Sequence, residues 1–257
     1  MKIITFSASK GGVGKTTLSF NYGSWLAQQG YKVLLIDTDY QANLSSTFDF
    51  FTTENTVFNI FTDGIIKLHE VADNLTLLPA SPNLDQLETM LQSRVNKEFM
   101  MMMWMQDHRA MIDNFDFILI DTHPEFGTLT KNMIAVSDYV FVPIEPSEYG
   151  FNQSRNQFDI RMEKFRAEAV DFMTRKSVID AKVYYIANRV KKNTKSSQAF
   201  IRVLSELDAV LALIPERELF NSSTILKMPI FDIPNSNKLL EDIVPEFNKI
   251  LDRTKEN

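Results

Sequence analysis

The chain has 257 residues, of which 44% are hydrophobic and 23% charged, with a formal net charge of −6 and no cysteine. This length suits one large domain or two small ones, and the composition is globular rather than disordered or collagen-like. The absence of cysteine excludes disulfide frameworks, thiolate zinc sites, iron–sulfur clusters and cysteine nucleophiles. No apolar run reaches the ~18 residues of a membrane-spanning helix, and the N-terminus lacks a signal-peptide pattern. We therefore expect a cytoplasmic protein.

Short apolar runs of strand length alternate along the chain with longer amphipathic segments. The predicted strands cover residues 3–8, 32–36, 75–79, 117–120, 139–143, 183–186 and 210–214, and the predicted helices cover 18–29, 151–173 and 196–207. Gly30 is the expected cap at the end of the first helix. Short runs that are apolar on both faces and separated by helices indicate a parallel sheet. The expected fold is a single doubly wound α/β domain over residues 1–257, with a mostly parallel sheet, helices on both faces and ligands at the strands' carboxyl ends.

A glycine-rich loop follows the first predicted strand and runs directly into the first helix. It reads Ser9-Lys10-Gly11-Gly12-Val13-Gly14-Lys15-Thr16-Thr17, with Ser9 where the strict P-loop pattern has a glycine. Glycines let consecutive backbone N–H groups surround phosphate oxygens, and the helix N-terminus adds partial positive charge. In such a loop Lys15 reaches the β- and γ-phosphates and the Thr16 hydroxyl binds Mg²⁺. The sequence therefore predicts a nucleotide-phosphate site.

Carboxylates stand at the ends of two predicted strands. Asp37 and Asp39 follow the second strand, and Asp121 follows the run Phe-Ile-Leu-Ile at 117–120. Beside a phosphate loop, a carboxylate can orient the attacking water or hold Mg²⁺ through its hydration shell. We expect Asp37 and Asp121 at the metal, with Asp121 acting through water. A solvated turn is the alternative for the first pair.

Residues 10–17, Lys-Gly-Gly-Val-Gly-Lys-Thr-Thr, resemble the deviant Walker A motif of the ParA/MinD family of P-loop ATPases. Residues 37–41 resemble the family's second signature, with Tyr40 in place of a proline. The resemblance implies an ATP cradle from Gly11 to Thr17 and an early lysine, Lys10, that contacts phosphates bound to a second copy. The implied active species is an ATP-sandwich homodimer that needs Mg²⁺. Lys10, Lys15 and Asp37 are its implied catalytic residues, with Asp37 positioning water.

Further positions follow the order of the same family. His123-Pro124-Glu125 stands where relatives have Pro-Pro-Ser, which brings an imidazole and a carboxylate toward the γ-phosphate. A purely structural histidine is the simpler alternative there. Asn188-Arg189 and Ile214-Pro215 occupy the places that frame the adenine in relatives. The resemblance therefore implies that Asn188 and Pro215 bind nucleotide.

Charge is distributed unevenly along the chain. Residues 1–150 contain 9 Lys and Arg against 18 Asp and Glu, whereas residues 151–202 contain 12 against 5. A basic stretch can form a nucleic-acid surface on an acidic protein, although a solvated helix face is the simpler alternative. Such side chains neutralise phosphates without reading bases. The predicted DNA contacts are Lys191, Lys192, Lys195 and Arg202.

Several family members fit the sequence poorly. Nitrogenase iron protein-like reductases and arsenical pump ATPases rely on cysteines, and capsular tyrosine kinases carry tyrosines in their tail, whereas the last tyrosine here is Tyr185. Residues 238–257 have an apolar face but hold 4 basic and 5 acidic residues and are interrupted by Pro245, which disfavours a MinD-like membrane anchor. We expect a helix at about 236–254 to pack on the body instead. The Met100–Met105 run is expected to be partly buried, with a partner surface as the alternative.

The short, Soj-like ParA partition ATPases fit best. The chain starts at the first predicted strand, so no N-terminal helix-turn-helix is expected, and operator binding falls to a small partner. The resemblance implies an ATP-hydrolysing DNA-segregation protein whose ATP dimer coats nonspecific nucleoid DNA. A centromere-binding, ParB-like protein would stimulate hydrolysis and release it. A MinD-like membrane-associated regulator and a nucleotide switch acting on a protein partner are the alternatives.

Overall fold

The computed structural model describes residues 1–145, 150–191, 198, 201–202, 204, 207–234 and 236–256. Its strands are β1 (Lys2–Phe6), β2 (Val33–Thr38), β3 (His69–Ala72), β4 (Leu75–Leu78), β5 (Phe117–Thr122), β6 (Tyr139–Ile144), β7 (Lys182–Val190) and β8 (Val210–Pro215). They form one sheet in the order β3-β4-β2-β5-β1-β6-β7-β8. Neighbouring strands are parallel except β3 and β4, which are antiparallel. The predicted fold class is confirmed.

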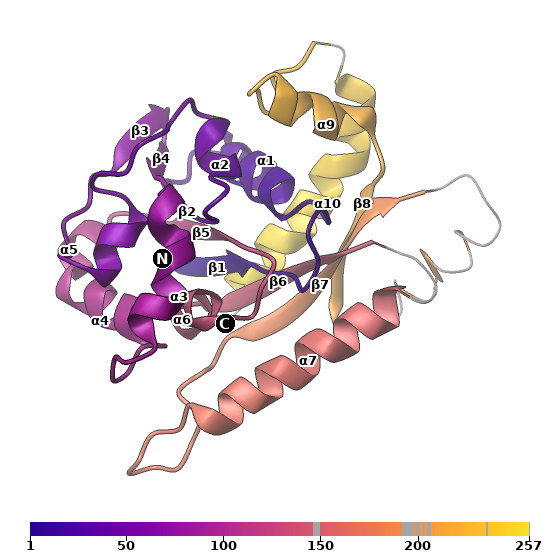
Figure 1. Ribbon diagram of the computed structural model, residues 1–257. Helices are drawn as coiled ribbons and strands as arrows, with labels where there is room; N and C mark the ends of the chain where they lie inside the picture. Colours follow the sequence, from indigo (N-terminus) through magenta and orange to yellow (C-terminus); the bar gives the residue numbers. More distant parts are fainter. Residues whose placement is uncertain are drawn as a thin grey trace.

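Helices cover both faces of this sheet (Figure 1). The α-helices are α1 (Lys15–Gln28), α2 (Asn43–Ser46), α3 (Leu87–Leu91), α4 (Met100–Asp107), α5 (Arg109–Ile112), α6 (Thr128–Ala135), α7 (Gly150–Glu168), α9 (Glu218–Ile225) and α10 (Asn237–Lys255). Two 3₁₀ helices span Val57–Phe61 and Pro82–Gln86. The helices α1, α9 and α10 pack on one face, and α3 to α7 pack on the other.

The central strands are apolar at consecutive positions because helices cover both faces of the sheet. Successive side chains of a strand point to opposite faces. On β5, Phe117 and Leu119 belong to the core beneath α1, whereas Ile118 and Ile120 belong to the core on the other face. Both sets are removed from water, so each residue of the strand gains from being apolar.

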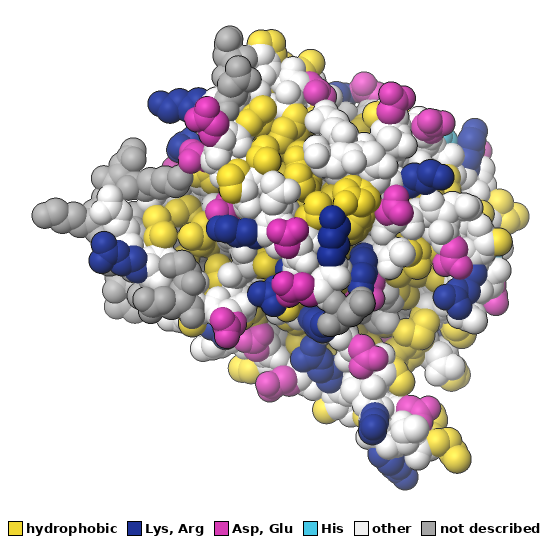
Figure 2. Space-filling model, turned by 180° about the vertical axis from the view of Figure 1, so that it is seen from behind, with side chains coloured by type: hydrophobic (Ala, Val, Ile, Leu, Met, Phe, Trp, Pro, Cys, Tyr) yellow, Lys and Arg dark blue, Asp and Glu magenta, His cyan; other side chains and the backbone are white. Residues whose placement is uncertain are grey.

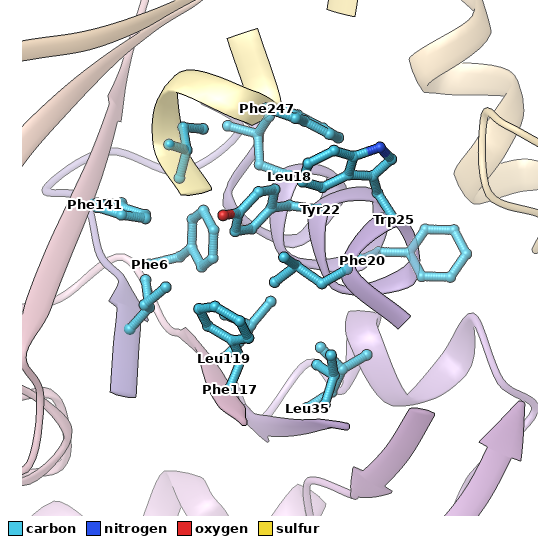
Figure 3. Close-up of a cluster of buried hydrophobic side chains, with 14 of the residues drawn as sticks. Phe6, Leu18, Phe20, Tyr22, Trp25, Leu35, Phe117, Leu119, Phe141 and Phe247 are labelled. Atoms are coloured by element: carbon cyan, nitrogen blue, oxygen red, sulfur yellow. The ribbon is translucent and has the colours of Figure 1, made fainter. Parts of the chain in front are cut away.

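The core beneath α1 is rich in aromatic side chains (Figure 3). Leu18, Tyr22 and Trp25 follow one another at helical spacing along α1 and point toward the sheet and α10. Phe247 of α10 lies 5.2 Å from Tyr22 and 5.6 Å from Trp25 between ring centroids. Ile243, Ile250 and Leu251 of α10 are buried with it. The C-terminal helix therefore completes this core.

Several elements differ from the sequence-based predictions, which contain no counterpart for helices such as α6 and α9. The edge strand β3 has no predicted counterpart, because its residues alternate between half-buried and exposed and form no apolar run. The helix predicted over 151–173 ends at Glu168, and the chain then reverses through a bridge between Val170 and Ser177. The C-terminal helix predicted at about 236–254 is present as α10, which continues through Pro245. The helix predicted over 196–207 lies largely outside the described residues.

The methionine run is divided between the core and the surface, which confirms its partial burial. Met101 and Met105 are buried on α4, whereas Met103 is exposed. The backbone N–H of Met101 donates to Asn132 Oδ1 on α6 at 3.0 Å. Across the described part of the chain, no helix is both long and apolar enough to cross a membrane.

Candidate nucleotide-binding site

The phosphate loop adopts the conformation that its glycines permit. Gly12 and Gly14 have φ angles of 76° and 91°, in the left-handed region that disfavours side chains. Gly14 caps the N-terminus of α1, so the loop leads straight into that helix. A Cβ on Gly14 would collide with Asn188. Glycine is therefore required at this position both by the backbone and by its neighbour.

Lys15 lies at the start of α1 and is only 6% exposed. Burial lowers the pKa of its ammonium below the ordinary value, while the nearby carboxylates of Asp121 and Asp39 oppose that shift. A largely desolvated cation at a helix N-terminus attracts anions strongly. This position suits a phosphate group.

Asp121 lies directly beside the loop. Thr16 Oγ1 donates to Asp121 Oδ2 at 2.6 Å, and Asp121 is fully buried. Its other oxygen, Oδ1, has no hydrogen-bond partner among the described residues. The pKa of Asp121 is raised to about 8, mainly by burial and next by the charge of Asp37, whose effect is larger than the opposing effect of Lys15. A buried hydroxyl–carboxylate pair with an unmet acceptor fits a hydrated Mg²⁺, which takes oxygen ligands.

The carboxylate of Asp37 is held in place by hydrogen-bond donors from the segment that follows β2. The backbone N–H and hydroxyl of Ser45 both donate to Asp37 Oδ2 at 2.7 Å, and the N–H of Asp39 donates to Oδ1 at 3.1 Å. Burial raises the pKa of Asp37 to about 6 in spite of these donors. Ser45 Oγ also accepts from the N–H of Ala80 at 2.9 Å. Sequence reasoning missed Ser45, since a lone serine in a helical turn carries no signal.

Residues that depart from the ParA/MinD pattern come together next to these carboxylates. His123 Nδ1 lies 2.9 Å from Asp39 Oδ1, and His123 Nε2 lies 3.8 Å from Glu125 Oε1. The ring of Tyr40 packs on that of His123, with centroids 4.4 Å apart. The loops that follow β2 and β5 are therefore tied to each other through His123.

Near the end of β7, Asn188 contacts the phosphate loop and Arg189 pairs with a residue that follows β6. Asn188 Nδ2 donates to the carbonyl oxygen of Val13 at 2.7 Å. Arg189, with a φ of 59°, pairs with Glu145 at the end of β6 at 2.5 Å. Pro215 ends β8, in register with Val190 of β7. Asn188 thus contacts the loop itself, and the adenine role implied for it and Pro215 stays a prediction.

Lys10 behaves differently from Lys15. Its side chain is exposed, and it lines a cavity of about 60 Å³ between the phosphate loop, the end of β6 and α7. Other residues that line this cavity are Ser9, Val13, Glu145 and Ser154. The lysine is therefore available to a group outside its own phosphate cradle.

The predicted DNA contacts are only partly described. Lys191 Nζ lies 3.6 Å from Glu216 Oε2, and both side chains are exposed. Arg202 is also within the described residues, whereas Lys192 and Lys195 lie outside them. An exposed ion pair of this kind contributes little to stability, so Lys191 can exchange its partner at low cost.

Comparison with known proteins agrees with this geometry. A family model described as an AAA domain matches residues 1–171. The sporulation initiation inhibitor protein Soj of Bacillus subtilis is 37% identical over 155 residues, 58% of this chain and 60% of that protein. The chromosome partitioning protein ParA of Myxococcus xanthus is 29% identical over 170 residues, 62% of this chain and 58% of that protein.

A crystal structure of a plasmid partition protein from Borrelia burgdorferi bound to AMPPNP is also similar. It has a TM-score of 0.76 and 26% identity, and the alignment covers 98% of this chain and 96% of that one. The chain spans about 60% of the length of the two curated relatives. A family model that covers most of the chain, ParA and Soj relatives and this shared fold together show that the chain belongs to the AAA domain family, as a member of the ParA type.

Proposed function

We propose that this protein is a Mg²⁺-dependent ATPase of DNA partition. The observation that carries the proposal is the contact between Thr16 and Asp121, 2.6 Å long, beside the buried Lys15. A hydroxyl, a carboxylate with an unused oxygen and a desolvated cation at a helix N-terminus are what a metal-bound nucleoside triphosphate requires. The AMPPNP complex of the similar Borrelia partition protein supports the same ligand.

Each residue of the site has a separate part in hydrolysis under this proposal. Backbone N–H groups of Gly11 to Thr17 and the Lys15 ammonium hold the phosphates, and Thr16 and Asp121 hold Mg²⁺, with Asp121 acting through water. The bound Mg²⁺ neutralises charge that develops on the transferred phosphoryl group. Asp37, whose orientation Ser45 and Asp39 fix, positions the attacking water and contributes to the metal environment.

Lys10 is proposed to act on a second copy of the chain. It is exposed beside the loop, whereas Lys15 is buried within it. Closing two chains over two nucleotides would bring each Lys10 to phosphates held by the partner, so ATP would act as a dimerisation ligand. Loss of the γ-phosphate on hydrolysis would remove that contact and open the dimer.

The ATP dimer is proposed to bind DNA without sequence preference. The basic stretch between residues 151 and 202, with 12 cationic and 5 acidic side chains, supports this assignment, and Lys191, Lys192, Lys195 and Arg202 are the proposed contacts. Pairing two such surfaces in a dimer raises their combined affinity. A small centromere-binding protein is the proposed trigger for hydrolysis and release from nucleoid DNA.

The C-terminal helix argues against a MinD-like membrane regulator. The side chains that would enter a bilayer, among them Ile243, Phe247 and Ile250, are buried against α1 and the sheet. Exposing them would remove a large part of the core beneath α1. A membrane role through α10 would therefore require local unfolding.

A titration of random-sequence duplex DNA with ATP, with ADP and without nucleotide tests the proposal. We expect retention that requires ATP and weakens steeply with salt, and a Lys15→Ala control that retains no DNA under any condition. Equal retention with ADP would contradict the nucleotide dependence. Absence of DNA retention together with flotation on anionic vesicles would favour the membrane alternative, and absence of both would favour a switch for a protein partner.

A further inference from the structure

A hairpin that projects beyond the end of α7 carries apolar side chains at its tip. It spans residues 169–178 and stands away from the body at the lower left of Figure 1. Its base is anchored, because Ala169 and Ile179 are buried. Phe172 and Met173 are 88% and 91% exposed, the highest values for large apolar side chains in the part of the chain that the structure describes. Exposed apolar groups of this size mark interaction surfaces.

The tip is a well-formed turn. The N–H of Asp171 donates to the carbonyl of Lys176, and the N–H of Arg175 donates to the carbonyl of Asp171, both at 2.9 Å. Asp171 Oδ1 accepts from the N–H groups of Met173 at 3.1 Å and Thr174 at 2.6 Å. The backbone of the turn therefore holds the two apolar side chains outward. Because this backbone is already ordered, binding would not carry the entropic cost of ordering it.

Cationic side chains flank this tip. Arg175 and Lys176 are exposed, whereas the Asp171 carboxylate is directed back to the amides of the turn. In Figure 2 the projecting hairpin, at the lower right, shows hydrophobic side chains at its end and dark blue ones beside them. An apolar tip with cations beside it fits a ligand that has anionic groups on its surface and apolar groups in its interior.

We propose that this hairpin is a DNA wedge. Phe172 and Met173 enter the minor groove between base pairs, and Arg175 and Lys176 contact the flanking phosphates. Proteins that bend duplex DNA without reading its sequence insert apolar side chains in this way. The inference rests on the proposed DNA binding and adds a contact at the opposite end of β7 from Lys191.

A lipid bilayer is the other structure with anionic groups over an apolar interior. A single myristoyl chain gives only marginal membrane binding, and Phe172 and Met173 together carry fewer apolar carbons than that chain. A base step, by contrast, is opened by one or two inserted side chains. The small size of the tip therefore favours DNA.

The position of the hairpin suits a duplex that lies along α7. This helix has 19 residues and so spans about 28 Å, close to the ~34 Å of one duplex turn. Arg161 and Lys164 are exposed on it between its two ends.

The hairpin and the phosphate loop lie at opposite ends of the parallel strands. The hairpin precedes β7, whereas the phosphate loop follows the carboxyl end of the parallel strand β1. Changes at the tip should therefore leave nucleotide binding intact.

DNA bending measures the wedge directly. The probe is a 30-base-pair random duplex with a donor and an acceptor dye at its two ends, mixed with the protein and a non-hydrolysable ATP analogue. We expect the parent to increase energy transfer, and the double variant Phe172→Ser, Met173→Ser to bind about tenfold more weakly without any increase, because base contacts are lost. Val95→Ser, which removes another apolar side chain that is 86% exposed, is the matched control and should behave as the parent.

Replacing Arg175 and Lys176 together with Gln should flatten the slope of log K against log salt by up to about 1.8, at ~0.9 per phosphate contact. Thermal unfolding and ATP affinity of every variant should match the parent. The wedge is overturned if the parent binds DNA without bending it, or if the serine variant bends it equally. Absence of any ATP-dependent DNA binding would overturn the proposed DNA function as well. Flotation on phosphatidylglycerol vesicles that depends on Phe172, with DNA left straight, would assign the tip to membranes instead.

Discussion

Asp37 and Asp121 lie opposite each other on neighbouring parallel strands, in the register that pairs β2 with β5. Both carboxyl groups are fully buried, and the charge of Asp37 raises the pKa of Asp121. Lys15 is the cation that opposes this repulsion. Burial is the main cause that raises the pKa of both carboxyl groups, so without nucleotide and metal both bind protons more tightly than they would in water.

The burial of Asp37 predicts a pH-dependent gain in stability for Asp37→Asn without nucleotide. Burial raises the pKa of Asp37 from 3.8 to about 6, so its ionisation favours the unfolded chain. The stability that comes from the protonated Asp37 carboxyl group is fully present below pH 3.8 and is lost as the pH rises through 6. Relative to the parent, the variant should gain up to about 3 kcal/mol between pH 4 and pH 7, at ~1.36 kcal/mol per pKa unit. Urea unfolding at several pH values measures it, and a difference independent of pH would contradict the shift.

Asp37→Ala should keep ATP binding and the ATP dimer but stall hydrolysis, because phosphate contacts drive dimerisation whereas water placement drives turnover. Single-turnover phosphate release measures the effect, and Asp73→Ala, at an exposed carboxylate in the turn between β3 and β4, serves as the control. Rapid turnover by the variant would move the catalytic role elsewhere, with Glu125 the next candidate.

Asn188→Ala should weaken ATP binding and destabilise the protein by about 1–3 kcal/mol. It removes the amide that donates to Val13 at 2.7 Å and leaves that carbonyl in the phosphate loop without this partner. Calorimetric titration with ATP and thermal unfolding report the two effects. Asn188→Gln keeps the amide on a side chain that is longer by one methylene. It should recover part of the lost ATP affinity and stability only if the phosphate loop can shift. An unchanged ATP affinity would show that this contact does not support the loop.

Replacing Lys191, Lys192 and Lys195 together with Glu should sharply weaken DNA binding and leave ATP binding intact. Arg189 is left out, because it pairs with Glu145 beside the phosphate loop. Each lost phosphate contact should flatten the salt slope by about 0.9, and binding should remain indifferent to base sequence. A triple variant that holds random duplex as tightly as the parent, with the same slope, would exclude this patch.

The sequence predicted the central strands and the phosphate loop well, because both depend on short local patterns. Buried parallel strands appear as apolar runs, and the glycines of residues 11–14 precede a helix start. It could not predict the contact of Ser45 with Asp37, because a lone serine in a helical turn carries no signal, or the contact of His123 with Asp39, because the two residues lie far apart in the chain. The end of α7 was also predicted too late. A turn centred on Asp171 stops the helix where the sequence pattern alone continues it.

The two lysines in the phosphate loop have different roles in the proposed mechanism. Lys15 is buried at the start of α1, whereas Lys10 is exposed, so one is proposed to hold its own chain's nucleotide and the other its partner's. The decisive measurement is sedimentation of the parent, Lys15→Ala and Lys10→Ala with Mg²⁺ and a non-hydrolysable ATP analogue, with bound nucleotide quantified in parallel. We predict a nucleotide-bound dimer for the parent, a nucleotide-free monomer for Lys15→Ala and a nucleotide-bound monomer for Lys10→Ala. A parent that binds nucleotide but remains monomeric, or a Lys10→Ala variant that dimerises as the parent does, would contradict the account.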